Sequence, residues 1–494
     1  MPRVPLLAGS RVVLVPAGDE DLVLRPPPPV ERGVSAGAAV RDALRFPLSG
    51  PPLESLTTRG GRATVVVEPP ALPLPGTQQD PRPEALAAAL SELERCGVRP
   101  ERQTVLVAGG LARRAGRHEL ERLLPPAQAR AFRGRVLVHD AADDALVPLT
   151  DGIRVHPALV DTDLALVLGS AETVLHGGPG TLLAASDAAT VRSVAGGESL
   201  LTAWGAPGWE LARRLEAALA RRVALAGVSL VLDLPRLTGA FRGYPHDAAA
   251  TAALARSWTR AAFSRLPPSL RRAVLSTQGR RLAAAAAFAG PPSVAHAEAL
   301  VRGIELRATR LEEQVDALVV GIPWTGPHLP RVPANPVTAA AVALGLVLRL
   351  HRGVFPLRPG GTLVLVHRLA RSFAPSEVPY ASLLEVLRAS SAPELLAQAE
   401  RAAATDPKTL AAYRAGRTCH PLLPYTDWAG CAPALARLGR VVVAGCRDAV
   451  AARALGFVPA RSIASALEMA HGVAGGRARV GILLAPPYPP LLAG

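Results

Sequence analysis

The chain has 494 residues, 49% of them hydrophobic and 19% charged, which excludes global disorder and suits two or three domains with large cores. Its formal net charge of +15 would ordinarily suggest a nucleic acid partner. That partner is disfavoured here, because the basic residues are scattered arginines with Lys408 as the single lysine, and aromatic side chains, which stack on bases, make up only 4%.

The cysteines, the first residues and the apolar runs together predict a protein of the cytoplasm with no membrane partner. The four cysteines form no CxxC pair, so neither a zinc ribbon nor a disulfide framework is indicated. Residues 1–10 do not resemble a secretory signal, and the apolar run over residues 337–348 is too short to cross a bilayer.

In the first half of the chain, short apolar runs alternate with segments of helical composition. Four runs are predicted to be strands, at residues 65–67, 104–107, 135–138 and 164–168. Helices are predicted over residues 83–97 and 117–124. Buried apolar strands that alternate with helices indicate a mostly parallel sheet. Before them, four consecutive prolines within residues 25–30 predict an extended polyproline stretch.

The pattern returns in the second half, after an irregular stretch. Strands are predicted at residues 317–321, 362–366 and 441–445, with helices over 338–350 and from Asp448 onward. We therefore expect two α/β domains with mostly parallel sheets and a cleft between them. The expected organisation is an N-terminal extension with edge elements (1–60), an α/β domain (61–232), a helical connection (233–292) and a second α/β domain (293–494).

The sharpest local feature is a glycine-rich loop that follows the predicted strand at residues 164–168. It contains His176, Gly177, Gly178 and Gly180, with Glu172 shortly before. Ligands of parallel sheets bind beyond the carboxyl ends of the strands, and glycines let backbone N–H groups approach a phosphate. The loop matches neither GK[ST] nor GxGxxG. The alternative is a tight turn that needs positive φ, and the neighbouring histidine and glutamate favour binding.

Two other strand ends carry polar residues. His139 and Asp140 follow one strand, and a histidine beside a carboxylate suits a metal ligand or a general base. Asp140 as a helix cap, with His139 satisfied by the backbone, explains them equally well. Arg113 and Arg114 follow another strand, where they would hold a phosphate or carboxylate, or form a solvated pair.

Taken in order, these segments resemble the nickel-pincer lactate racemase superfamily. His139-Asp140-Ala141 is similar to that family's HDA segment, and Gly177-Gly178 to its glycine loop. The resemblance covers roughly residues 61–487. In the C-terminal half it is carried by residues 319–335, 360–362, 413–428 and 456–470.

The resemblance implies a racemase of small 2-hydroxy acids. In this family a nickel ion is held by a pincer nucleotide derived from nicotinic acid. The nucleotide is attached to a lysine through a thioamide, and histidines also bind the nickel. The cofactor accepts a hydride, which side chains cannot do, while two histidines act as acid and base on the hydroxyl.

Carried over residue by residue, the resemblance assigns catalysis to His139 and His176, and makes His176 the nickel ligand. It implies that the cofactor or substrate is bound by Glu68, Arg113, Arg114, Glu172, Gly177, Gly178, Gly180 and Asn335. Asn335 stands about where the family has a substrate-contacting glutamine.

The sequence departs from the family at several functional positions. Ala71 replaces an arginine, Ala112 a histidine, and the attachment lysine falls at or near Gly180. Because Lys408 is the only lysine and arginine is a poor nucleophile, covalent attachment at the family position is excluded. Two hypotheses remain. One is a racemase or epimerase of a 2-hydroxy acid with the nucleotide bound non-covalently. The other is a non-catalytic protein of this fold that binds a ligand or partner.

Overall fold

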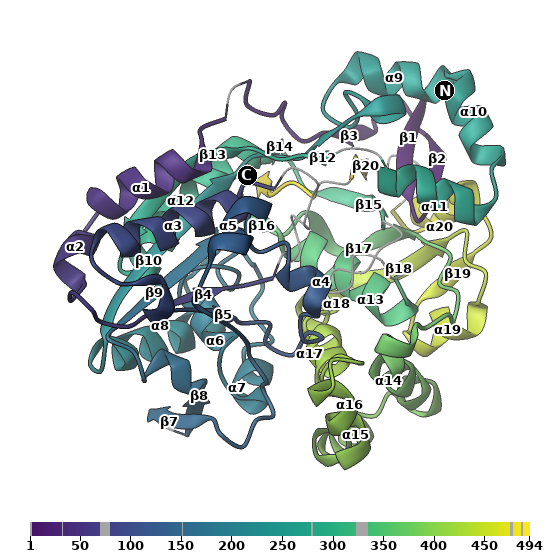
Figure 1. The fold of residues 1–494 in the computed structure, drawn as a ribbon. Helices are drawn as coiled ribbons and strands as arrows, with labels where there is room; N and C mark the ends of the chain where they lie inside the picture. Colours follow the sequence, from purple (N-terminus) through teal and green to yellow (C-terminus); the bar gives the residue numbers. More distant parts are fainter. Residues whose placement is uncertain are drawn as a thin grey trace.

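In a computed structural model, the chain folds into two α/β halves, each built on a six-stranded sheet (Figure 1). The structure describes residues 2–31, 33–69, 80–150, 152–277, 280–322, 334–474, 478–485 and 488–494. The predicted α/β class with mostly parallel sheets is confirmed. None of the helices in these ranges is both long and apolar enough to cross a membrane.

The first sheet has the order β13-β10-β9-β4-β5-β6. Its strands are β4 (Ala63–Val67), β5 (Gln103–Val107), β6 (Arg135–Val138), β9 (Leu164–Ser170), β10 (Ala224–Leu232) and β13 (Ala284–Gly290). All pair in parallel except β13, which runs antiparallel to β10. Alternate side chains of the central strands enter two separate cores, one on each face, which is why these strands read as continuous apolar runs.

Helices cover both faces of this sheet. On one face lie α1 (Ala36–Arg45) and α3 (Arg82–Arg95), whose apolar residues share a core with β4 and β9. The other face carries α6 (Pro179–Leu183), α8 (Pro207–Ala220) and, against β10, α12 (Pro292–Arg307). The carboxyl ends of the parallel strands are thereby left as the edge where a ligand would bind.

The second sheet has the order β19-β18-β17-β15-β20-β3, and all its strands are parallel. They are β3 (Leu22–Leu24), β15 (Val315–Gly321), β17 (Leu357–Val366), β18 (Leu438–Ala444), β19 (Val458–Ala460) and β20 (Val480–Leu483). The hairpin of β1 (Arg3–Ala8) and β2 (Arg11–Pro16) packs on β15 and β17 through a shared core. The first residues of the chain therefore lie with the C-terminal half, as the purple hairpin shows at the upper right of Figure 1.

The stretch over residues 233–292, predicted to be a helical connection, is helical only in part. It contains α9 (Ala248–Arg256), α10 (Trp258–Arg265) and α11 (Pro268–Thr277), but its end forms β13, so the prediction was wrong there. Five consecutive alanines, Ala283 to Ala287, favour a helix by propensity. Here the small side chains let both α1 and α12 contact the strand, and tertiary packing overrides the local preference.

Candidate functional site

The glycine loop lies where predicted, at the carboxyl end of β9. Gly177 and Gly178 have φ of 97° and 53°, a region that disfavours other residues. A Cβ at Gly177 would lie 2.2 Å from the Ser170 carbonyl oxygen, and one at Gly178 would lie 2.3 Å from Cβ of His296. The two glycines are therefore required by packing within the chain, which is what the tight-turn alternative anticipated.

His296 on α12 was missed by the sequence analysis, which had no local signal for it. Its side chain is completely buried, its Nε2 lies 2.9 Å from the Thr173 carbonyl oxygen, and its ring stacks on Trp209. Burial lowers the pKa of His296 to about 4, so the ring is neutral at physiological pH. It closes one side of the glycine loop with an uncharged aromatic surface.

Glu68 faces the loop from the end of β4. Its Oε1 accepts a weak hydrogen bond of 3.4 Å from the Gly177 N–H. Desolvation raises the pKa of Glu68 to about 7, although Thr181 and Gly177 oppose the rise. The Gly177 N–H, one of the loop donors expected to face an anionic ligand, is thus directed at a carboxyl group of the chain itself.

Glu172 is held by Arg307 of α12. The Arg307 Nη1 donates to Glu172 Oε2 at 2.8 Å, and the two side chains are only 3% and 4% exposed. Arg307 also donates to the Ala171 carbonyl oxygen at 3.1 Å. This buried pair joins α12 to the loop and balances the charge of the carboxylate through Oε2, while Glu172 Oε1 is buried without a partner.

His176, the predicted nickel ligand, is half-buried at the start of the loop. Its Nδ1 lies 2.8 Å from the Thr173 hydroxyl oxygen. Within the residues that the structure describes, no group of three or more histidine, cysteine, aspartate or glutamate side chains could hold a metal ion. The described residues thus supply no co-ligands for a metal on His176.

His139 follows β6, as predicted, but it is buried within the first half. It is 2% exposed, and its Nε2 lies 2.8 Å from the Ser186 carbonyl oxygen. Burial lowers the pKa of His139 to about 4. Asp140 accepts from the Ala142 N–H at 2.9 Å in a turn, so it does not cap a helix as the alternative expected, and of the two ring nitrogens of His139 only Nε2 has a backbone partner.

The two arginines after β5 are bound by internal acceptors. Arg113 pairs with Glu119. Arg114 reaches Asp140 Oδ2 at 3.3 Å and donates to the Arg414 carbonyl oxygen at 2.6 Å. Neither guanidinium is presented to the glycine loop by these contacts. A phosphate or carboxylate would have to compete with a carboxylate already in place.

The carboxyl ends of β5 and β6 are covered by the second half of the chain. Tyr413, on α16 (Pro407–Arg414), accepts from the Ala141 N–H at 3.1 Å and donates to the Gly110 carbonyl oxygen at 3.3 Å. The His420 N–H donates to the Leu111 carbonyl oxygen at 2.9 Å. The two halves therefore meet at the edge where the family resemblance expects an open site.

Asn335, the candidate from the C-terminal half, is a helix cap. Its Oδ1 accepts from the Thr338 N–H at 2.9 Å at the start of α13 (Pro336–Ala340). Its Nδ2 donates to Glu377 Oε1 at 3.0 Å. Because Asn335 is fully buried, both ends of its amide are used inside the second half.

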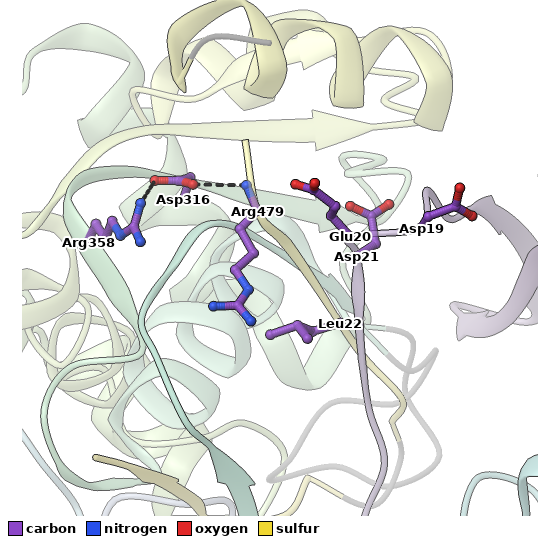
Figure 2. A pocket seen from close by; sticks show the side chains of 7 residues that line it. All are labelled: Asp19, Glu20, Asp21, Leu22, Asp316, Arg358 and Arg479. Carbon is purple, nitrogen blue, oxygen red and sulfur yellow. Dashed lines mark hydrogen bonds and ion pairs between the residues drawn. The ribbon is translucent and has the colours of Figure 1, made fainter. Parts of the chain in front are cut away.

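A cavity of about 410 Å³ lies elsewhere, at the amino ends of the second sheet's strands (Figure 2). There Asp316 accepts from Arg358 Nη1 at 3.1 Å and from the Arg479 N–H at 2.9 Å. Asp19, Glu20 and Asp21 line its other side. None of the predicted site residues lines this cavity, and it is at the opposite end of the sheet from the edge where ligands usually bind.

Comparison with known proteins identifies the fold that carries these residues. Residues 9–171 match the family described as the lactate racemase N-terminal domain. The match covers less than half of the chain, and it shows that residues 9–171 are similar to this N-terminal domain.

Two solved structures are similar to this lactate-racemase-like chain. The lactate racemase apoprotein from Thermoanaerobacterium thermosaccharolyticum has a TM-score of 0.62 and 13% identity, with 100% of each chain covered. That likeness shows a shared fold. A Thermotoga maritima protein has a TM-score of 0.49 and 11% identity, with 94% of this chain and 100% of that chain covered. None of the curated proteins matches the sequence.

The residues of this lactate-racemase-like chain do not fit the covalently attached nickel-pincer nucleotide that the family implies. At Gly180, where the attachment lysine falls, a Cβ would lie 2.2 Å from the Leu175 carbonyl oxygen, so no side chain has room. Lys408, the only lysine, is exposed on α16, just after the N-cap residue Asp406. The chain therefore lacks the attachment lysine, and the backbone of Leu175 fills the space that a side chain at Gly180 would need.

Proposed function

We propose that this chain is a non-catalytic member of the lactate-racemase-like superfamily, which uses the fold as a scaffold to bind a ligand or partner. The observation that carries the proposal is the state of His139. The histidine that the resemblance makes an acid or base is buried, and its ring is bonded to the Ser186 carbonyl oxygen. Acid–base catalysis needs a group that reaches the substrate and titrates near the working pH, and His139 meets neither condition.

The other carried-over residues support the same proposal. Glu172 is neutralised by Arg307, Arg114 is engaged by Asp140, and Asn335 is engaged by Glu377. Each of these side chains is engaged by another group of the chain, while Glu172 Oε1 and Arg114 Nε are buried without a partner. A scaffold that has lost its catalytic role would be expected to satisfy its polar groups internally in this way.

A racemase with a non-covalently bound nucleotide is the second candidate, and Glu68 is the observation that favours it. A carboxyl group with a pKa of about 7 at the mouth of the glycine loop would exchange a proton with a substrate hydroxyl near neutral pH. In this reading Glu68 takes the role that His139 cannot perform, and His176 remains the candidate metal ligand.

The experiment that separates the two is metal and activity analysis of the full chain, co-expressed with the enzymes that make the nickel-pincer nucleotide. We expect far less than one nickel per chain, no nucleotide absorbance and no racemisation of D- or L-lactate. The lactate racemase from Thermoanaerobacterium thermosaccharolyticum, treated identically, is the control that shows the cofactor is being made.

Stoichiometric nickel together with racemisation would overturn the proposal. The second candidate then requires that Glu68→Gln abolish the activity while the nickel content is retained, and that His176→Ala remove the nickel. Racemisation that survives both substitutions would also reject this site assignment.

A further inference from the structure

Four arginines lie near the carboxyl end of the second sheet, where α11 shares a core with the β1–β2 hairpin. Arg368 follows β17 and Arg447 follows β18, while Arg11 begins β2 and Arg271 lies on α11. The Arg447 N–H donates to the Arg368 carbonyl oxygen at 2.9 Å, which joins the two strand ends. The Gly9 N–H donates to the Ile322 carbonyl oxygen at 2.6 Å, which places the β1–β2 turn over the end of β15. We name these four residues the arginine cluster.

The positive charges of the arginine cluster act on one another, and none of the described carboxylates forms an ion pair with the Arg368 or Arg11 side chain. The pKa of Arg368 is lowered to about 10 by burial and by Arg11, Arg447 and Arg271. Burial and two of the same arginines also lower the pKa of Arg11. Like charges held together in this way destabilise a protein unless an anion joins them.

The cluster also has unused donors. Among the described residues, the side chains of Arg11, Arg368 and Arg447 make no hydrogen bond or ion pair, and Nη2 of Arg368 is buried without a partner. Arg271 is 3% exposed and donates from Nη1 to the Leu266 carbonyl oxygen at 2.6 Å, but its Nε is buried and unpartnered. By contrast, the nearby Arg371 pairs with Asp448 at 2.6 Å.

The backbone beside the cluster is strained. Leu369 has a φ of 46°, and it is the only residue other than glycine with positive φ among those described. Its N–H donates to His367 Nδ1 at 3.1 Å, and its side chain is fully buried. Such strain persists where the surroundings hold a residue in place, and it concentrates at functional sites. Here the buried side chain of Leu369 and the hydrogen bond of its N–H hold the turn that carries Arg368.

We propose that Arg11, Arg271, Arg368 and Arg447 form a binding site for a small molecule that carries a phosphate group. A planar guanidinium donates two parallel hydrogen bonds to the oxygens of one phosphate group. Several arginines together favour an anion that carries more than one negative charge. The carboxyl ends of parallel strands are the usual place for such a ligand. The site does not rest on the proposed function, because it uses another sheet and none of the residues carried over from the family.

The test is isothermal titration calorimetry of the full chain with inorganic pyrophosphate at constant ionic strength, with acetate as the singly charged comparison. We expect pyrophosphate to bind at one site per chain and acetate not to bind. Arg368→Gln should weaken pyrophosphate binding by about tenfold or more, since charge-assisted hydrogen bonds are lost. Arg352→Gln, an exposed arginine on β16 (His351–Gly353) outside the cluster, should leave binding unchanged.

Arg447→Gln provides a second variant, because that side chain is exposed and its loss should not prevent folding. Absence of pyrophosphate binding to the wild type, or equal weakening by Arg368→Gln and Arg352→Gln, would overturn the site. Binding of a DNA oligonucleotide far tighter than pyrophosphate, and lost in Arg368→Gln, would replace the small molecule with a nucleic acid.

Discussion

The carboxyl ends of the two sheets are electrostatic opposites. At the first sheet, Glu172 pairs with Arg307, Arg114 pairs with Asp140, and burial raises the pKa of Glu68 to about 7. At the second sheet, the arginine cluster has no carboxylate partner in the described part of the chain. Ligands of parallel sheets bind at the carboxyl ends of the strands, so the difference between the two sheets indicates which of these ends still needs an external ion.

The same comparison bears on the proposal that the chain is non-catalytic. The family resemblance locates function at the first sheet, where glycines would leave room for a cofactor. In this chain the room beside Gly178 is filled by His296, and the room beside Gly180 by the Leu175 backbone. Residues that resemble a site in sequence can therefore be held inside the core by contacts with the rest of the chain, although His139 Nδ1 and Glu172 Oε1 are buried there without a partner.

The largest expected effect concerns the Glu172–Arg307 pair. Arg307→Ala should lower the free energy of unfolding by about 3–5 kcal/mol, because it leaves a buried carboxylate without its partner. Urea denaturation measures this. Arg302→Ala on the same helix removes an exposed pair with Glu305 and should cost less than about 1 kcal/mol. Similar costs for the two variants would mean that the first sheet's pair is no more structural than a surface contact.

The buried histidines of the first half predict a loss of stability in acid. The pKa of His139 and that of His296 are about 4 in the folded protein, against an ordinary value of 6.5. As pH falls below about 6.5 the unfolded chain takes up protons that the folded chain does not, so stability drops until the pH reaches about 4. Between pH 7 and about pH 5, each histidine should lower the free energy of unfolding by about 2 kcal/mol, as measured by urea denaturation.

Glu68 acts in the opposite direction and limits the net change. Its pKa is raised to about 7, so its contribution to stability is complete in acid and is lost as pH rises from about 4.5 through 7. His139→Gln should flatten the acid loss, and Glu68→Gln should steepen it. A pH profile that neither substitution alters would show that these groups are solvated rather than buried.

The sequence predicts the fold better than it predicts the site. Apolar runs marked the strands at residues 65–67 and 317–321, because strands covered on both faces lack polar alternation. The glycine loop was also located correctly. Propensity failed at Ala284 to Ala287, where helices on either side decide the conformation.

The rest could not be predicted because the deciding contacts are distant in sequence. His296 Nε2 contacts the carbonyl oxygen of Thr173, which is 123 positions away in the sequence. The residues around each position give no indication of this contact. The arginine cluster is assembled from positions between 11 and 447, and in the sequence each member resembles any other scattered arginine. The composition was misleading for the same reason. Because arginines are scattered along the whole chain, the four of the arginine cluster cannot be distinguished from the others in the sequence.

The smallest expected effect tests the second sheet's side of the comparison. If the arginine cluster is repulsive when no anion is bound, Arg368→Gln should raise the free energy of unfolding by up to about 1 kcal/mol at low salt. The gain should disappear at high salt, which screens exposed charges. Urea denaturation of the wild type, Arg368→Gln and Arg352→Gln at both salt concentrations measures it, and Arg352→Gln should show no such gain. A loss of stability in Arg368→Gln at low salt would mean that its contacts are favourable overall. The second sheet would then resemble the first, because its charged side chains would stabilise the fold without a bound ligand.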